Sequence, residues 1–505
     1  MIQLDGDSLT LESFFKIVEQ FEQVSLSPKA RERILKSRAA VDKAAQSGQR
    51  HYSINTGFGI LSKVSIPSDQ LETLQVNLIR SHCAGVGECH SERESRAILL
   101  LRTNVLAKGF CGVRPELVEL CLSLLNHKVH PRIPTIGSVG ASGDLAPLAH
   151  LASVLIGEGD AFFQGFRLTG KEALEKAGLK PIKLAAKEGL SLINGTQQMT
   201  AMAALLLRQS ERIVDTADLI CSASLEGILG SPKAYKEWVH AVRPHAGQSR
   251  SAELLRSFMQ DSEIYQSHLT CDRVQDPYSL RCAPQVHGAC RDLLSFVRKT
   301  VETELNAATD NPLVNPDTGE IVSNGNFHGQ PLAFALDILG MAVSEIASIS
   351  ERRTVKLINP VFSELPTFLV KNEGLNSGFM ISQYTAASLV VENRILTHPA
   401  STDSVTTNNE KEDHNSMGPI SARKAKKIIE NTQYVLAIEA LAACQALEFR
   451  KPLKPGRGPR ALHAYVREEI PPLDNDRYLH TDMERVAVMI REEEIWTHAH
   501  EKGLL

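Results

Sequence analysis

Residues 137–150 read Gly137-Ser138-Val139-Gly140-Ala141-Ser142-Gly143-Asp144-Leu145-Ala146-Pro147-Leu148-Ala149-His150. The first half consists of glycines and small residues, and the second half is apolar and opens a helical pattern. Glycine reaches backbone conformations that are closed to other residues, and Gly143 has no Cβ to shield its own amide nitrogen. If that nitrogen is pressed onto the carbonyl carbon of Ala141, a five-membered ring can close.

Closure of this ring leads to an electrophile that the twenty side chains lack. Loss of one water from the ring, and of a second water from the Ser142 side chain, leaves an imidazolone with an exocyclic methylene. The alternative for the tripeptide alone is an ordinary Gly/Ser loop before a helix, with Asp144 near the N-cap.

The composition excludes several classes of partner. The 505 residues are 43% hydrophobic and carry a net charge of −4 at pH 7, which argues against a surface for nucleic acid or an anionic membrane. Nine cysteines are widely spaced without a CxxC pair, as in reduced cytosolic proteins. The N-terminus shows no signal peptide, and no apolar run approaches the ~20 residues of a membrane span. We therefore expect a cytoplasmic protein.

Helical periodicity dominates the chain, and strand signals are few and short. The fold class predicted is mainly α: a long-helix bundle with a smaller N-terminal region of helices and loops that carries residues 137–150. The predicted segments are an N-terminal region (1–195), a central bundle (196–450) and a C-terminal helical tail (451–505). The segment from Pro331 to about 357 is apolar on nearly all sides, so we expect a buried core helix in a bundle shared between subunits.

Caps and turns divide the rest of the chain. Ser8 or Thr10 is expected to cap the first helix and Ser27 the second, and Asn194 can cap a long helix that runs to about 228. A hairpin is expected within 160–180. The other predicted helices cover 91–108, 114–126, 144–156, 250–260, 284–307, 379–397, 417–448 and 480–499.

Several polar residues in loops are candidates for chemistry. Tyr52 lies in a glycine-punctuated loop and His82 at a helix end, and each is ordinarily a structural residue. Arg281 has apolar and aromatic neighbours, and its planar fork of donors suits a carboxylate. Glu412 belongs to a charged run that is ordinarily a solvated loop.

Taken together, these segments resemble the ammonia-lyases of histidine and aromatic amino acids, in the same order from about 50 to 450. The resemblance implies a mainly helical homotetramer with active sites drawn from more than one subunit. It also implies a 4-methylidene-imidazol-5-one group (MIO) made from Ala141, Ser142 and Gly143, with no external cofactor and no metal.

The resemblance assigns roles to further residues. Tyr52 becomes the base that removes the substrate's β-proton, and Phe327 packs beside the prosthetic ring. Arg281 holds the substrate carboxylate, and close to it lie Tyr278, Asn194 and Gln275. Because a free phenol has a pKa near ~10, positive helix ends or other donors are needed to lower the pKa of Tyr52.

His82 and Glu412 point to one branch of this family. Its phenylalanine-specific members carry an apolar residue at the first position and a neutral amide at the second, and its tyrosine-specific members lack the acid. A polar pair suits an imidazole, which offers one donor and one acceptor. We therefore expect L-histidine as substrate, with trans-urocanate and ammonia as products. Lys411 stands where this branch usually has glutamine, and a cation beside Glu412 could lower its basicity.

Two alternatives remain open from the residues. One is a tyrosine or phenylalanine ammonia-lyase, or an aminomutase, on the same scaffold. The other is a helical tetramer that has lost catalysis and serves as a binding or structural protein.

Overall fold

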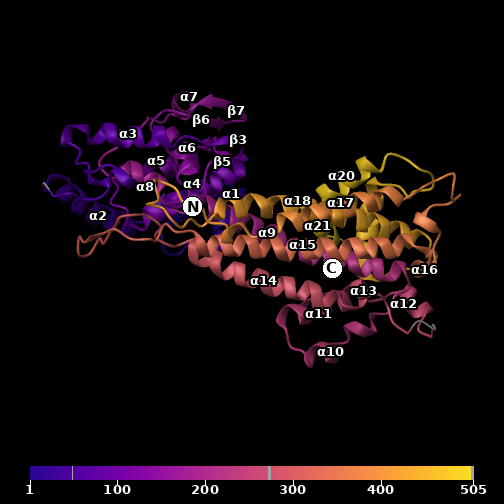
Figure 1. Ribbon diagram of the computed structural model, residues 1–505. Coiled ribbons are helices and arrows are strands. Elements are labelled where there is room, and N and C mark those ends of the chain that lie inside the picture. Colours follow the sequence, from indigo (N-terminus) through magenta and orange to yellow (C-terminus); the bar gives the residue numbers. More distant parts are fainter. Residues whose placement is uncertain (48, 271–273, 502–505) are drawn as a thin grey trace. The chain divides into compact units, whose positions relative to one another are not determined.

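The computed structural model describes residues 1–47, 49–270 and 274–501 (Figure 1). It is mainly helical, as predicted, and its strands are two to four residues long. The strands form four small sheets. Their pairings are β1 (Ile2–Leu4) with β2 (Val24–Leu26), β3 (Val86–Cys89) with β5 (Pro134–Ile136), β4 (His130–Pro131) with β6 (Asp160–Phe163) and β7 (Phe166–Thr169), and β8 (Leu313–Val314) with β9 (Ile321–Val322).

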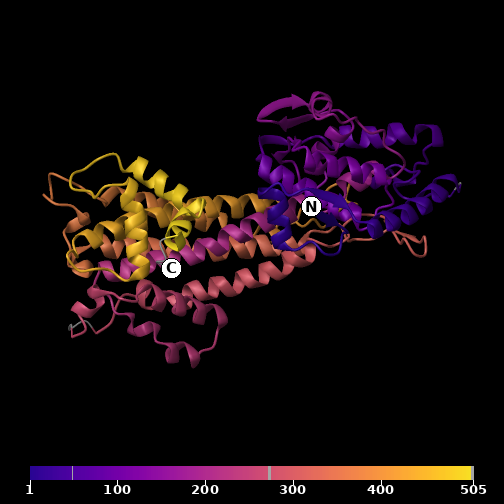
Figure 2. The ribbon, with the colours of Figure 1, turned by 180° about the vertical axis from the view of Figure 1, so that it is seen from behind.

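The chain forms two compact units. Unit 1 comprises 1–205, 298–337 and 399–423, and unit 2 comprises the remainder. Four long helices have residues in both units: α9 (Gln197–Gly227), α14 (Ala283–Glu304), α15 (Gln330–Ile358) and α18 (Gly418–Glu448). Figure 2 shows them from behind. The three-segment division of the sequence stays a prediction.

Part of the core of unit 1 is built around α4, which is buried from Glu94 to its end. It packs against the other helices near the N-terminus. The Thr10 and Ser27 side chains accept hydrogen bonds from Ser13 N and Ala30 N, which confirms both caps, whereas the Ser8 hydroxyl donates to Asp5. The helices are α1 (Leu11–Glu19), α2 (Pro28–Gln46), α4 (Glu92–Ala107) and α5 (Pro115–Asn126).

A second group of helices in unit 1 flanks the loop that follows β5. Three helices pack on one another there, namely α3 (Leu71–His82), α6 (Ala146–Leu155) and α8 (Glu188–Ile193). The hairpin predicted within 160–180 is confirmed as β6 and β7, and an unpredicted helix, α7 (Gly170–Lys176), follows it.

The long helices in unit 2 enclose a buried charged network. His287 Nδ1 donates to Asp218 at 2.7 Å, and the fully buried Arg353 pairs with Glu439. These four side chains come from four different helices, α14, α9, α15 and α18. Because an uncompensated buried charge is strongly destabilising, the pairs hold the helices in one register.

The helix α15 is the one described helix that is long and apolar enough to span a membrane, and 72% of its most apolar window is buried. It is therefore packed as a core helix, as its sequence predicts.

The polar stretch before α14 is more helical than predicted. The pattern predicted only the helix at 250–260, which is observed as α11, because the other helices here are too short to show a period. Its elements are η3 (Pro232–Tyr235), α10 (Glu237–Ala241), α11 (Ala246–Phe258), α12 (Glu263–Ser267) and α13 (Tyr278–Arg281).

The C-terminal part of unit 2 also differs from its prediction. The single helix expected at 480–499 is two helices, because Glu493 has a left-handed backbone with φ of +59°. The elements here are α16 (Pro360–Ser363), α17 (Met380–Leu396), α19 (Arg457–Glu469), α20 (Leu479–Arg491) and α21 (Glu494–Glu501).

Candidate active site

The Ala141-Ser142-Gly143 tripeptide lies in a tight bend of unit 1. Ser142 and Gly143 both have left-handed backbones, with φ of +50° and +82°. Gly143 lies directly against Gly195, and a Cβ on Gly143 would come within 2.1 Å of the Gly195 carbonyl oxygen. Asp144 N donates to that same oxygen at 2.7 Å. Only glycine fits at this position, so the bend depends on the approach of two distant loops.

Asp144 supports the bend in a way that its sequence position does not predict. Asp144 lies next to the N-cap of α6, which is Leu145, but it gives that helix no side-chain cap. The Asp144 carboxylate instead accepts from Gln198 N at 2.6 Å and from Met199 N at 3.3 Å, at the start of α9. Burial raises the pKa of Asp144 to about 8, although these two amides act to lower it.

Asn194 is likewise not the N-cap of the long helix, which begins at Gln197. Its buried side chain donates from Nδ2 to the Ser142 carbonyl at 3.2 Å. Asn194 therefore bonds the tripeptide and does not cap α9, and the active-site role implied by the resemblance stays a prediction.

Arg102 is a supporting residue that sequence reasoning missed. It is fully buried in α4, and its Nη1 donates to the Asn194 carbonyl at 3.0 Å and to Gln197 Oε1 at 2.7 Å. These bonds fix the turn that carries Asn194. A signal was available, since an arginine inside the apolar run 97–107 needs buried partners.

Glu412 reaches the same bend from a loop far along the chain. Its Oε1 accepts from the Ser142 hydroxyl at 3.1 Å, and its Oε2 accepts from Thr407 Oγ1 at 2.9 Å. Just beyond it, Met417 N donates to the Val139 carbonyl at 2.9 Å. The ordinary interpretation as a solvated charged loop therefore fails for Glu412, which is half-buried.

Tyr52 lies close enough to Glu412 for the carboxylate to act on its ionisation. Burial raises the pKa of Tyr52, and the nearby charge of Glu412 raises it further. One donor opposes them, the Gly59 N–H, which reaches the phenol oxygen at 3.3 Å. The pKa of Tyr52 is thus raised, and not lowered as the role of a base requires.

His82 is the last residue of α3, and burial lowers its pKa. Its Nδ1 lies 2.8 Å from the Leu78 carbonyl and must donate to it. A neutral ring in this tautomer keeps Nε2 as an acceptor. The charge of Glu412 also acts on this ring, so the two residues that the resemblance links to substrate choice lie in one neighbourhood.

Phe327 is half-buried in the turn before α15, also in unit 1. The next residue, His328, donates from Nε2 to the His414 carbonyl at 3.0 Å, which joins this turn to the Glu412 segment. The predicted contact of Phe327 with the tripeptide stays a prediction.

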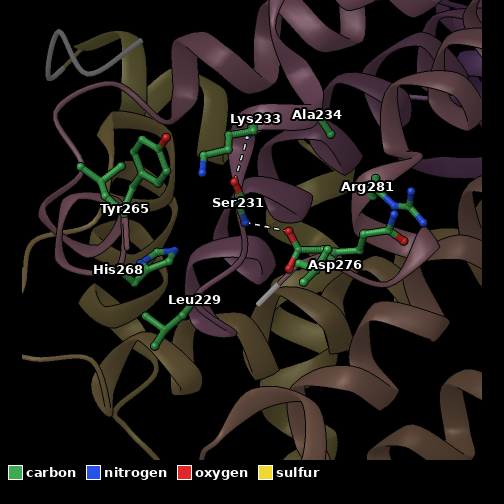
Figure 3. Close-up of a pocket in the computed structure, with 11 residues that line it drawn as sticks. Leu229, Ser231, Lys233, Ala234, Tyr265, His268, Asp276 and Arg281 are labelled. Atoms are coloured by element: carbon green, nitrogen blue, oxygen red, sulfur yellow. Dashed lines mark hydrogen bonds between the residues drawn. The ribbon is translucent and has the colours of Figure 1, made fainter. Parts of the chain in front are cut away.

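Gln275, Tyr278 and Arg281 belong to unit 2. Gln275 and Arg281 line a pocket of about 130 Å³, in which Ser231 N donates to Asp276 at 2.7 Å (Figure 3). The Arg281 guanidinium lies 4.9 Å over the exposed ring of Tyr278, and within the described residues its buried Nε has no hydrogen-bond partner. This free donor fits a carboxylate ligand. Contact of the three residues with those of unit 1 stays a prediction.

Comparison with known proteins covers nearly the whole chain. A family model described as aromatic amino acid lyase matches residues 9–468. A histidine ammonia-lyase of Myxococcus xanthus is 53% identical over 489 residues, which are 97% of this chain and 96% of that protein. The crystal structure of histidine ammonia-lyase from Trypanosoma cruzi has a TM-score of 0.91 at 43% identity, covering 99% of this chain and 95% of that one. A tyrosine aminomutase of Streptomyces globisporus has a TM-score of 0.93 at 36% identity, covering 99% and 98%.

Proposed function

Since this chain belongs to the aromatic amino acid lyase family, we propose that it is a histidine ammonia-lyase that converts L-histidine to trans-urocanate and ammonia. The observation that carries the substrate is the carboxylate of Glu412, 3.1 Å from the Ser142 hydroxyl, with His82 in the same neighbourhood. A carboxylate and a neutral imidazole can pair with the donor and the acceptor of the substrate's ring.

The tripeptide fits the prosthetic group that the family resemblance implies. Ser142 and Gly143 are left-handed, and the Gly195 backbone leaves no room for a side chain on Gly143. In the proposed maturation, Gly143 N bonds to the Ala141 carbonyl carbon, and two waters leave, one from the ring and one from Ser142. The finished group supplies an electrophilic methylidene carbon for the amine of the substrate. Asn194 Nδ2 donates to the Ser142 carbonyl at 3.2 Å and so helps to hold the tripeptide in place.

Tyr52 is the proposed base for the β-proton of the substrate. Its phenol is neutral, so a fraction of the protein must hold it as phenolate when it acts. The Gly59 N–H, 3.3 Å from the phenol oxygen, stabilises that anion. The charge of Glu412 disfavours the phenolate of Tyr52. In the proposed complex, the imidazole ring of the substrate lies between Tyr52 and Glu412 and donates to the carboxylate.

Binding of the substrate carboxylate is assigned to Arg281, with Gln275, Tyr278 and Asn194 nearby, as the resemblance implies. The unpaired Nε of Arg281 among the described residues supports this assignment. We further propose the homotetramer of the family, with active sites built from more than one subunit, and a cytoplasmic location.

The alternative is a lyase or aminomutase for tyrosine or phenylalanine. The similarity to a tyrosine aminomutase supports this alternative. An aminomutase returns the amine to the β-carbon and makes a β-amino acid.

Incubation of the purified protein with L-histidine, L-tyrosine and L-phenylalanine in parallel tests the proposal. We expect the ultraviolet absorption of urocanate from histidine, ammonia in equal amount and little product from the other two. Preferred turnover of tyrosine or phenylalanine, or a β-amino product, contradicts it. The intact mass is an independent check, because a mature chain is lighter than its sequence by two waters.

A further inference from the structure

The ammonium of Lys411 bonds the turn after the Tyr52 loop, although its neighbour in sequence is Glu412. This ammonium donates to the Gly59 carbonyl at 3.2 Å and to Ser62 Oγ at 3.1 Å. In the part of the chain that the structure describes, it forms no ion pair with Glu412. Both acceptors lie in η1 (Gly59–Lys63), which directly follows the loop of Tyr52.

A second residue of the Glu412 loop contacts the same turn. Asn408 Oδ1 accepts from Ile60 N at 3.4 Å, and Asn408 Nδ2 donates to Glu412 Oε1 at 3.3 Å. Gly59 is left-handed, with φ of +54°, and a Cβ there would lie 2.1 Å from Asn408 Nδ2. A side chain at position 59 would therefore have to displace the Asn408 amide, and the left-handed backbone there favours glycine as well.

Gly59 links the contact between the two loops to Tyr52, the proposed base. Its carbonyl accepts from Lys411, whereas its N–H donates to the Tyr52 phenol at 3.3 Å. A displacement of η1 thus moves the donor that stabilises the phenolate of Tyr52. The same loop pair carries Glu412, so the contact also sets the spacing of the two side chains.

We propose that Lys411 is a positioning residue that, with Asn408, holds η1 and thereby Tyr52 in the geometry for proton removal. The role of Lys411 rests on the proposed function of Tyr52, whereas the contact itself does not. Because the base acts in the transition state and not in binding the ground state, loss of the contact lowers kcat more than it changes KM.

The test compares Lys411→Met, which keeps the aliphatic stem without the donor, with Lys411→Arg, which keeps a cationic donor. We expect a fall in kcat of about 5-fold for Lys411→Met, the effect of one modest hydrogen bond, with KM nearly unchanged. Amide hydrogen exchange over 57–64 should be faster in this variant, whereas exchange in α4 should be unchanged. Lys411→Arg should restore both readouts.

Ser62→Ala provides a second variant on the opposite loop. Its fall in kcat should be smaller than that of Lys411→Met. Added to Lys411→Met, Ser62→Ala should lower kcat no further, since the bond that it removes is already lost. Wild-type kcat or wild-type exchange over 57–64 in Lys411→Met overturns the proposal. If the unaltered protein fails to deaminate histidine, the proposed function fails, whereas the exchange data still report on the contact.

Discussion

The hydroxyl of Ser142 donates to Oε1 of Glu412 at 3.1 Å, although the two residues are 270 positions apart. Glu412 is fixed at this place by Thr407 Oγ1 and Asn408 Nδ2. The pair joins the proposed source of the electrophile to the residue that we propose selects the substrate. A change at Ser142 therefore tests the electrophile, and a change at Glu412 tests the choice of substrate.

Ser142→Ala removes the hydroxyl that leaves as the second water. We expect the fold to persist and turnover to vanish, because no methylidene carbon can form. Intact mass measurement should show that the loss of two waters is incomplete. Ser257→Ala, at an exposed serine of α11, is the control and should keep both mass and rate. Substantial turnover by Ser142→Ala excludes the assigned electrophile.

Glu412→Gln keeps the shape of the side chain and removes its charge. We propose that Glu412 accepts from a ring nitrogen of the substrate or takes part in proton transfer. Because general acid–base groups contribute about 100-fold or more, we expect a fall of that order in histidine turnover. Glu410→Gln neutralises an exposed carboxylate two positions earlier and should have little effect. An unchanged rate in Glu412→Gln removes the reason for preferring histidine as substrate.

Tyr52 predicts the pH dependence of the reaction. Burial raises its pKa above that of a free phenol, so the phenolate is scarce at neutral pH and grows as the pH rises. We expect kcat/KM to increase between about pH 7 and pH 10. Tyr52→Phe should abolish this increase along with nearly all activity, whereas Tyr478→Phe, at a ring that is 89% exposed, should not. A profile that falls steadily over this range contradicts the assignment of Tyr52 as base.

Gly143→Ala tests the close approach of the two loops. Gly143 and Gly165 have nearly the same backbone, with φ of +82° and +81°, but nothing lies within 4 Å of a Cβ on Gly165. Gly165→Ala therefore measures the conformational cost alone, about 1 kcal/mol. Gly143→Ala adds the clash with the Gly195 backbone and should lower the melting temperature further and reduce the fraction that loses two waters. Equal effects of the two changes are incompatible with the observed packing.

Arg281→Lys tests the binding of the substrate carboxylate. Lysine keeps the charge but loses the planar fork of donors, so we expect KM to rise by about 10-fold with a smaller change in kcat. Arg250→Lys, at an exposed arginine of α11, is the control. The assignment of Arg281 is wrong if both variants bind histidine as the unaltered protein does.

Much of the helical framework could be predicted from the sequence, because its signals are local. The apolar surface of α15 and the caps at Thr10 and Ser27 lie within a few residues of the elements that they define. Shorter helices such as α7 and α10 gave no signal, since they span too few turns for a period to show.

The candidate site was predictable only in its residue types. Local reasoning placed Asp144 near the N-cap of α6 and offered Asn194 as the cap of α9, but neither side chain caps the helix that follows it. Asp144 bonds the start of α9, 54 residues away, and Asn194 bonds Ser142. The same reasoning placed the cation of Lys411 beside Glu412, whereas it bonds Gly59, 352 residues away.

The sequence by itself determined a mainly helical chain and a tripeptide of small residues able to cyclise, because periodicity, capping and the absence of a Cβ act over neighbouring residues. Only the tertiary structure decided which carboxylate meets Ser142, which helix Asp144 serves and where Lys411 points. A polar side chain bonds whatever partner the folded chain brings within about 3 Å, and that partner is set by how distant loops pack.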